Sequence, residues 1–280
     1  MKLLRVGAIN KEKPAILDDQ GIIRDLSNVL DDFNSNTLNK NFFEIINKTN
    51  LSKLKEVPKN TRVGSCVQNP NQFIGIGLNY KDHAKETNAI PPKEPIVFIK
   101  ANSSISGPND NIIIPRNSKK TDWEIELGII IGKKTKYISE EESLNHIFGY
   151  CIVNDISERE FQLERSGQWD KGKGCDTFGP IGPYLVTKDE IKNVQDLNLE
   201  LKLNGKTMQK SNTSNMIFSV KYIVSYLSHF ITLHSGDIIT TGTPAGVGMG
   251  REPNIFLKNG DLLNLNISGL GEQKQKVLSE

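Results

Sequence analysis

The stretch TDWEIELGIIIG, residues 121–132, says more about the fold than any other part of the sequence. Isoleucine and leucine crowd it and a glycine ends it, which predicts a short buried β-strand. Glu124 and Glu126 nevertheless stand inside this apolar run. Side chains alternate between the faces of a strand, so both carboxylates point the same way. Unpaired buried carboxylates are costly, and a cation in front of them is the simplest partner.

A solvated face of a sheet would also carry two neighbouring glutamates. Ile130 falls on the same face, however, and the other face is apolar throughout, which favours burial. Magnesium, manganese and calcium ions all prefer oxygen ligands. Asp155, after the apolar run in GYCIVNDIS, would supply a third ligand, although Asp in that position more often caps a helix or makes a turn. Three carboxylates from two strands would leave positions open for water or substrate, as a catalytic metal requires.

The composition of the chain argues against several classes of function. The chain has 280 residues and a net charge of +2, so we expect no binding to nucleic acid or to a membrane surface. No apolar run approaches the roughly 20 residues of a membrane span, and the start of the chain shows no signal-peptide pattern. Cys66, Cys151 and Cys175 lack the spacing of a zinc or redox motif. This predicts free thiols in a reducing cytoplasm.

Short strand-like runs dominate the chain from residue 71 onward, bounded by Gly, Pro or Asn. Helical patterns are convincing only over residues 80–88, 140–147 and 219–233. We therefore expect a mostly β protein with short helices, whose catalytic domain over residues 71–280 forms a sandwich or a rolled barrel. Residues 1–70 combine three short strands with a polar, Asn-rich helical stretch at about 28–54. This combination predicts a small α+β N-terminal domain.

The segment IGLNYKDHAKE follows another predicted strand and carries a histidine and a glutamate. His83 and Glu86 are three residues apart, which places them on one face of a helix. A carboxylate beside an imidazole orients the ring and raises its basicity, as water activation requires. An ordinary surface pair has the same spacing. The opening GIGLNY lacks the third glycine of a dinucleotide-binding fingerprint, so we exclude that class.

Two glycine-rich segments, both predicted to be loops, offer further candidates. In WDKGKGCDTFGPIGP, Lys173 stands among glycines that allow close backbone approach, where it could meet an anionic substrate or an oxyanion. TTGTPAGVGMG lacks the Gly-Lys-Ser/Thr of a phosphate loop, but its amides and Thr243 could hold a carboxylate. Arg159 and Gln162 share a face if DISEREFQ is helical, which also suits a carboxylate contact. For each of these three segments, an ordinary surface loop or a solvated surface pair remains the alternative.

Taken together and in this order, these motifs resemble the fumarylacetoacetate hydrolase superfamily over residues 71–280. The segment SEREFQLERSGQWDKGKGCDTFGP is most similar to the bacterial branch of diketo-deoxy sugar acid hydrolases and ureidoglycolate-lyase-like proteins. The resemblance implies a mixed β-sandwich roll, usually assembled as a homodimer. It also implies that Glu124, Glu126 and Asp155 bind Mg²⁺, with Mn²⁺ or Ca²⁺ as other candidates.

The resemblance assigns roles to the remaining candidates as well. His83 and Glu86 would form the water-activating dyad, and Lys173 would lie near the reacting oxygen. The positions that match substrate contacts are Arg159, Gln162 and Thr243. The superfamily includes hydrolases, decarboxylases, isomerases and hydratases, and its fold does not choose among them.

From these residues we expect a catabolic, metal-dependent hydrolase that cleaves a C–C bond in a small anionic 2,4-dioxo acid, either an acylpyruvate or a diketo-deoxy sugar acid. The metal would act as a Lewis acid, and His83 would take a proton from water. A decarboxylase of the oxaloacetate type or a lyase of the ureidoglycolate type would use the metal without water attack. A non-catalytic ligand-binding homologue would have lost a metal carboxylate or His83, and the sequence retains them all.

Overall fold

The computed structural model describes residues 1–280, apart from the side chain of Lys40. Its strands are β1 (Lys2–Val6), β2 (Lys13–Leu17), β3 (Ile23–Asp25), β4 (Phe73–Gly77), β5 (Ile96–Ile99), β6 (Ile105–Ser106), β7 (Ile112–Ile114), β8 (Thr121–Asp122), β9 (Ile125–Ile131), β10 (Ile147–Asn154), β11 (Ser157–Glu158), β12 (Gly179–Thr187), β13 (Asn198–Leu203), β14 (Lys206–Asn212), β15 (Ile238–Thr240), β16 (Leu262–Ile267) and β17 (Gly271–Ser279). Its α-helices are α1 (Lys40–Lys48), α2 (Lys81–Glu86), α3 (Glu140–His146), α4 (Asp170–Lys173) and α5 (Val220–Phe230), and a π-helical turn spans Glu160–Glu164.

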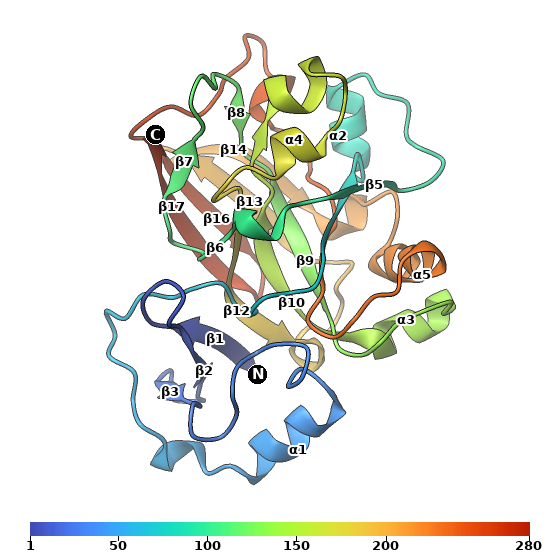
Figure 1. The fold of residues 1–280 in the computed structure, drawn as a ribbon. Helices are drawn as coiled ribbons and strands as arrows, with labels where there is room; N and C mark the ends of the chain where they lie inside the picture. The colour runs from blue at the N-terminus through green and yellow to red at the C-terminus, as the bar shows by residue number, and fades with distance from the viewer.

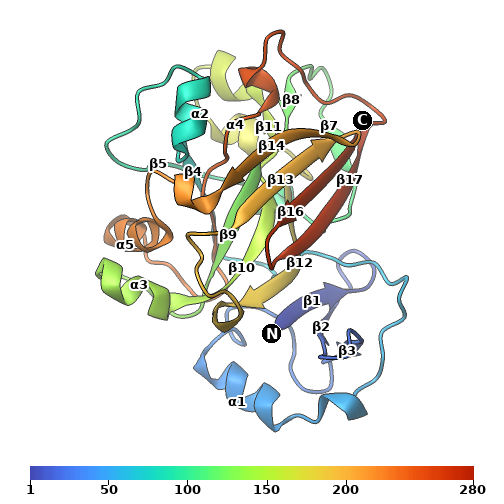
Figure 2. The same ribbon diagram turned by 180° about the vertical axis from the view of Figure 1, so that it is seen from behind.

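Two large sheets form the body of the molecule (Figures 1 and 2). The larger, ten-stranded sheet has the order β3-β2-β1-β12-β10-β9-β15-β4-β5, with β6 pairing β12. The smaller has five strands in the order β14-β13-β16-β17-β7, and β8 pairs β11 separately. Parallel and antiparallel pairs mix, since β15 runs parallel to β4 but antiparallel to β9. The predicted mostly β class, with mixed sheets and short helices, is confirmed, and over residues 1–280 the sheets do not close into a barrel.

The main core lies between the two sheets. Ile125, Leu127 and Ile129 of β9 belong to the same buried cluster as Leu201 of β13 and Leu265 of β16. The intervening side chains of β9 face the other way, because side chains alternate along a strand. Ile130, for example, is part of a second buried cluster. The face that β9 turns away from the main core is therefore the one that carries Glu126.

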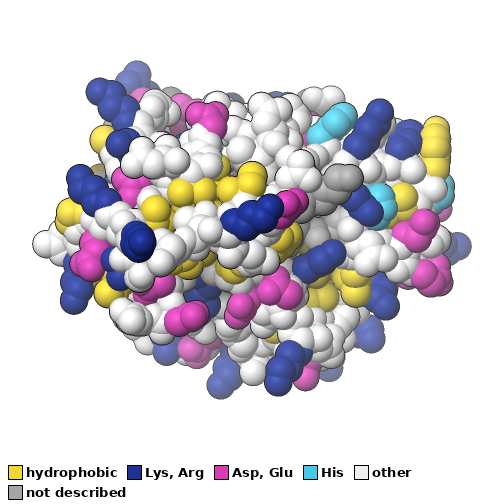
Figure 3. Space-filling view, turned by 90° about the horizontal axis from the view of Figure 1, so that it is seen from below, with side chains coloured by type: hydrophobic (Ala, Val, Ile, Leu, Met, Phe, Trp, Pro, Cys, Tyr) yellow, Lys and Arg dark blue, Asp and Glu magenta, His cyan; other side chains and the backbone are white. Residues whose placement is uncertain are grey.

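The N-terminal strands extend the larger sheet. Strand β1 pairs antiparallel with β12, with Leu3 opposite Leu185. The Phe42 ring of α1 packs edge-on against Phe148, with ring centroids 5.2 Å apart. A domain boundary near residue 70 stays a prediction. Seen from below, the surface of this end of the molecule carries basic and acidic side chains interspersed with hydrophobic ones (Figure 3).

Local signals account for most of the helices. The predicted helices over residues 80–88, 140–147 and 219–233 are present as α2, α3 and α5. The helix predicted at about 28–54 is much shorter: it begins at Lys40, because Asn39 caps it, while asparagines such as Asn34 bind backbone amides in turns before it. The predicted loop in WDKGKGC contains the single-turn helix α4. None of the described helices has the length and hydropathy that crossing a bilayer would require.

Candidate functional site

Strand pairing brings the three predicted metal ligands together. Glu124 and Glu126 flank the first residue of β9, and Asp155 follows the last residue of the neighbouring strand β10. The Asp155 amide donates a hydrogen bond to the Glu124 carbonyl over 2.9 Å, which fixes the register of these two ends. One carboxylate oxygen from each residue lies within 4.8 Å of the other two, and all three side chains are buried. The register of two adjacent strands is therefore enough to build the cluster.

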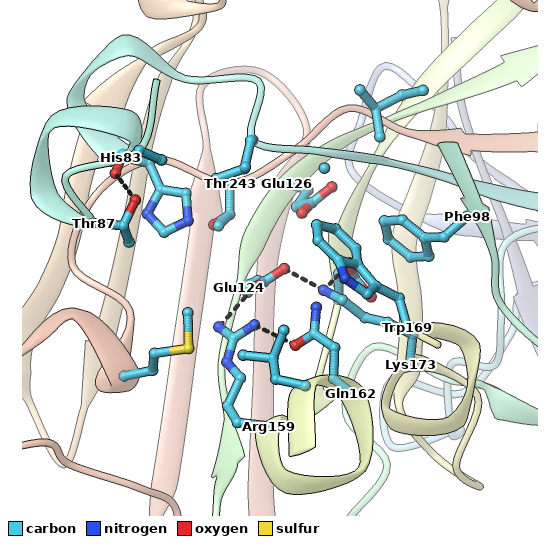
Figure 4. A pocket seen from close by; sticks show the side chains of 17 residues that line it. His83, Thr87, Phe98, Glu124, Glu126, Arg159, Gln162, Trp169, Lys173 and Thr243 are labelled. Atoms are coloured by element: carbon cyan, nitrogen blue, oxygen red, sulfur yellow. Dashed lines mark hydrogen bonds and ion pairs between the residues drawn. The ribbon is translucent and has the colours of Figure 1, made fainter. Parts of the chain in front are cut away.

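Two buried lysines neutralise part of this cluster. The Lys173 ammonium lies 2.6 Å from Glu124 Oε2 and 2.6 Å from Asp155 Oδ2 (Figure 4). The Lys100 ammonium lies 2.6 Å from the other oxygen, Asp155 Oδ1. Burial alone would lower the pKa of Lys173, but Asp155 and Glu124 outweigh it and hold that pKa above its ordinary value. Lys173 is therefore a cation that bridges two of the three carboxylates.

Arg159 supplies a third cation from the side of the π-helical turn. Its Nη2 lies 2.7 Å from Glu124 Oε1 and 2.8 Å from Asp122 Oδ2, as an ion pair rather than a well-aligned hydrogen bond. Its Nε donates to Asp122 over 2.9 Å, and its Nη1 donates to Gln162 over 3.1 Å. Burial would raise the pKa of Glu124, but Lys173 and Arg159 overcome this effect and hold it far below its usual range.

Glu126 has no cation beside it among the described side chains. Its Oε2 accepts hydrogen bonds from the Thr240 hydroxyl over 2.5 Å and from the Gly242 amide over 2.7 Å. Burial raises the pKa of Glu126 well above its usual range, and the negative charges of Asp155 and Glu124 raise it further. With Asp122 included, four carboxylates surround Lys100, Lys173 and Arg159, so one negative charge stays unbalanced when all four carboxylates are ionised. Clustered oxygen donors with surplus charge fit a hard divalent cation.

The histidine–glutamate pair lies on the other side of the same cavity. His83 Nδ1 is 3.0 Å from Glu86 Oε2 on α2, as the helical spacing predicts. The second oxygen, Oε1 of Glu86, accepts the Gly246 amide over 2.8 Å. The His83 ring points into the cavity (Figure 4), and no described residue bonds its Nε2. The contact with Glu86 places the proton on Nδ1, which leaves Nε2 free to accept one.

The cavity itself has a volume of about 220 Å³ and two unlike sides. Most of its polar lining side chains are buried and form a floor, whereas most of its apolar lining side chains are more exposed and form an outer wall. The polar lining residues are His83, Thr87, Glu124, Glu126, Asp155, Arg159, Gln162, Lys173 and Thr243. The apolar side includes Leu78, Ala89, Phe98, Leu163, Trp169 and Met249. Figure 4 shows the rings of Phe98 and Trp169 beside Lys173, with ring centroids 5.7 Å apart.

All the residues predicted from the sequence converge on this cavity. Each of them lines it except Glu86, which lies behind His83. The Thr243 hydroxyl donates to the Ile125 carbonyl over 3.0 Å and accepts from Gln209 over 2.8 Å, so its hydrogen is already used within the fold. Its role as a substrate contact, like the other assigned roles, stays a prediction.

Two charged residues of the site escaped the sequence analysis. Asp122 holds Arg159 and also accepts the amides of Gly248 and Met249 over 2.7 and 3.0 Å. Lys100 is fully buried against Asp155. The sequence carries a signal for each residue. Asp122 precedes Glu124 by two residues in TDWEIE, and Lys100 ends the apolar run PIVFIK.

Comparison with known proteins finds relatives that match almost the whole chain. Residues 72–278 match the family described as fumarylacetoacetate (FAA) hydrolase C-terminal. A protein of Burkholderia orbicola, named as a candidate hydrolase, is 53% identical over 278 residues, which cover 99% of each chain. The similarity therefore extends through the N-terminal strands as well as the site.

Two solved structures share the whole fold. Fumarylacetoacetate hydrolase from Exiguobacterium antarcticum has a TM-score of 0.89, 32% identity and full coverage of both chains. Maleylpyruvate hydrolase from Sphingobium sp. SYK-6 has a TM-score of 0.84 and 26% identity, with 100% of this chain and 99% of that chain covered. The latter structure contains a manganese(II) ion and pyruvate.

Proposed function

The chain belongs to the fumarylacetoacetate hydrolase family, and on that basis we propose that it is a metal-dependent hydrolase that cleaves a C–C bond in a small 2,4-dioxo acid. One observation carries the proposal. A buried cluster of three carboxylates and a His83–Glu86 pair face each other across one small cavity. A decarboxylase would need only a metal ion held by the carboxylates as its electron acceptor, whereas an oriented imidazole with a free nitrogen suits an attack by water.

Glu124, Glu126 and Asp155 would hold the metal, which we propose to be Mg²⁺, with Mn²⁺ and Ca²⁺ as other candidates. When bound, this ion supplies Lewis acidity to the oxygens of the oxo acid. The manganese ion and pyruvate in the maleylpyruvate hydrolase structure support a metal and a 2-oxo acid in the same site. Lys173 and Arg159 would remain beside the metal and offset the charge of the acid.

Side chains of the protein accept and donate the protons of the reaction. His83, held through Nδ1 by Glu86, takes a proton from water at Nε2 while the water oxygen attacks carbon 4 of the substrate. The bond between carbons 3 and 4 then breaks. Lys173, on the opposite side of the cavity, stabilises the negative charge and delivers a proton to carbon 3. The products are pyruvate or a substituted 2-oxo acid, and a new carboxylic acid that has gained its oxygen from water.

The family and the composition support further proposals. We propose that the protein is a homodimer with a catabolic role, as is usual for the family that it resembles. The three cysteines are free thiols, which supports a location in the cytoplasm.

The test is product analysis in heavy-oxygen water. Purified protein with Mg²⁺ is given acylpyruvates, a diketo-deoxy sugar acid and oxaloacetate. We expect cleavage of a 2,4-dioxo acid, with label in the newly formed carboxylate. Release of carbon dioxide from oxaloacetate, with no cleavage of any 2,4-dioxo acid, would select the decarboxylase alternative. Rearrangement without a new carboxylate would select an isomerase.

A further inference from the structure

We infer that the preferred substrate carries an apolar acyl group, rather than a second carboxylate or a hydroxylated chain. The inference rests on the proposed function, and it names the substrate class within it. It follows from three features of the cavity: where its cations are bound, which polar groups remain free, and what forms its outer wall.

The cations that line the cavity are already bound to carboxylates at its floor. Among the described lining residues only Lys173 and Arg159 carry a permanent positive charge. Lys173 lies 2.6 Å from both Glu124 and Asp155, and Arg159 is held between Glu124 and Asp122. Both would serve the 2-oxo acid end of the substrate. A second carboxylate at the far end would lose water without meeting a counter-ion, which is costly.

Side-chain donors that remain free for a substrate hydroxyl are also confined to the floor. The Thr87 hydroxyl donates to the His83 carbonyl over 3.0 Å, and the Thr243 hydroxyl donates to the Ile125 carbonyl. Gln162 keeps its amide nitrogen free, but its oxygen binds Arg159 beside the carboxylate cluster. A chain with several hydroxyl groups would therefore leave most of them unpaired, and each unpaired buried group weakens binding.

The outer wall of the cavity is apolar and built from separate elements. Gly77 at the end of β4 makes room for the Trp169 ring, because a Cβ atom at Gly77 would lie only 2.3 Å from it. Trp169 packs on Phe98 of β5, and Leu163 of the π-helical turn and Met249 of the loop after β15 complete the wall. An alkyl or aryl group placed there would move from water into contact with apolar side chains, and this transfer is favourable.

The experiment compares 2,4-dioxo acids of matched length that end in an alkyl group, a hydroxylated group or a carboxylate. We expect kcat/KM to be at least about tenfold higher for the alkyl compound than for the other two. A preference for the carboxylate or the hydroxylated compound would overturn the inference and leave the proposed hydrolase intact. Failure to cleave any of them would overturn the hydrolase.

Binding of unreactive mimics tests the inference separately from catalysis. N-alkyl oxamates and N-carboxyalkyl oxamates of equal length present the same 2-oxo acid end to the Mn²⁺-loaded protein. We expect the alkyl compounds to raise the melting temperature at lower concentrations, by about tenfold or more. Equal or tighter binding of the carboxyalkyl compounds would contradict the apolar wall even if no substrate is cleaved.

A charge placed in the wall should reverse the preference. Leu163 is 44% exposed at the mouth, so an arginine can be accommodated there. Leu163→Arg should raise kcat/KM for the carboxylate-ended compound at least about tenfold over Leu163→Gln, the uncharged control. Lack of any gain, in a variant whose melting temperature equals that of the control, would show that the distal group does not reach this wall.

Discussion

Glu126 differs from its two partners because nothing positively charged lies beside it among the described side chains. Glu124 and Asp155 each meet a lysine at 2.6 Å, whereas Glu126 meets only a hydroxyl and a backbone amide. Burial and the neighbouring charges raise the pKa of Glu126, so in the metal-free protein it tends to keep its proton. A metal ion would have to displace that proton.

The raised pKa of Glu126 predicts how the metal-free protein responds to pH. A carboxyl group whose pKa is higher in the folded than in the unfolded state stabilises the fold at low pH, and this contribution is lost as pH rises through the folded pKa. We expect the melting temperature of the metal-free protein to fall as pH rises from the ordinary pKa of a glutamate through the raised pKa of Glu126. Glu126→Gln should flatten this decline, and Mn²⁺ should restore the melting temperature of the wild type only. A decline of equal slope in the variant would contradict the assignment.

A metal bound as proposed would share Glu124 and Asp155 with Lys173, and the positive charge of the lysine should weaken its binding. Lys173→Met frees Glu124 and Asp155 of a positive charge 2.6 Å away. We expect Mn²⁺ to bind at least about tenfold more tightly, a gain of about 1.4 kcal/mol, while turnover is lost because the proposed proton donor is gone. Isothermal titration without substrate measures the affinity.

Lys171→Met is the matched control for this change. Lys171 lies on the same short helix, but it is exposed and donates to the Arg165 carbonyl. Its replacement should leave Mn²⁺ affinity unchanged. Weaker metal binding in Lys173→Met than in the control would show that the lysine supports the metal site rather than competing with it.

At the scale of elements, the loop after β15 positions Glu86, which contacts the proposed general base His83. The Gly246 amide holds Glu86, and a Cβ atom at Gly250 would lie 2.6 Å from the Glu86 carboxyl carbon. The far end of a flexible glutamate can move at little cost to the fold, but its contact with His83 would then be lost. We therefore expect the loop to set the orientation of His83, the proposed general base.

Gly250→Ala should weaken catalysis without weakening metal binding. A displaced Glu86 no longer orients His83, and loss of a general base commonly costs about 10²–10⁴-fold in rate. We expect kcat to fall toward that of His83→Ala, with Mn²⁺ affinity and melting temperature near those of the wild type. Steady-state kinetics and titration with Mn²⁺ provide the comparison. Unchanged kcat in Gly250→Ala would show that the loop does not control the pair.

Sequence patterns predicted the elements whose signals are local. The alternation in β9 placed its glutamates correctly, and the capping box of Ser139 and Glu142 marks the start of α3. The helix prediction over residues 28–54 is wrong before Lys40, because asparagine side chains compete for backbone amides and favour turns. Lys100 was missed for another reason: its contact with Asp155 exists only after β5 and β10 are assembled in the sheet.

At the scale of the whole molecule, the N-terminal residues contribute to the same sheet as the site. Strand β1 covers the edge of β12, and Leu3 and Phe42 share a buried cluster with Phe148 and Leu185. Removal of residues 1–70 would expose this cluster and leave the edge of β12 unpaired. Exposed apolar clusters and free strand edges favour aggregation.

We therefore expect a fragment of residues 71–280 to lose cooperative unfolding or to aggregate, although the family match begins at residue 72. Thermal denaturation and light scattering compare the fragment with the full chain at equal concentration. A fragment that unfolds cooperatively within a few degrees of the full chain, and binds Mn²⁺ equally well, would instead show that the predicted domain boundary near residue 70 separates independent units.

The most direct measurement of the proposed chemistry is anomalous scattering from a crystal soaked with Mn²⁺ and oxalate, which mimics the oxo acid. We expect a single strong peak in contact with the carboxylates of Glu124, Glu126 and Asp155, with oxalate beside it and facing His83 across the cavity. Activity that is lost on metal removal and restored by Mn²⁺ should accompany it. No peak at these carboxylates, in a protein that keeps full activity after verified metal removal, would contradict the metal-dependent mechanism.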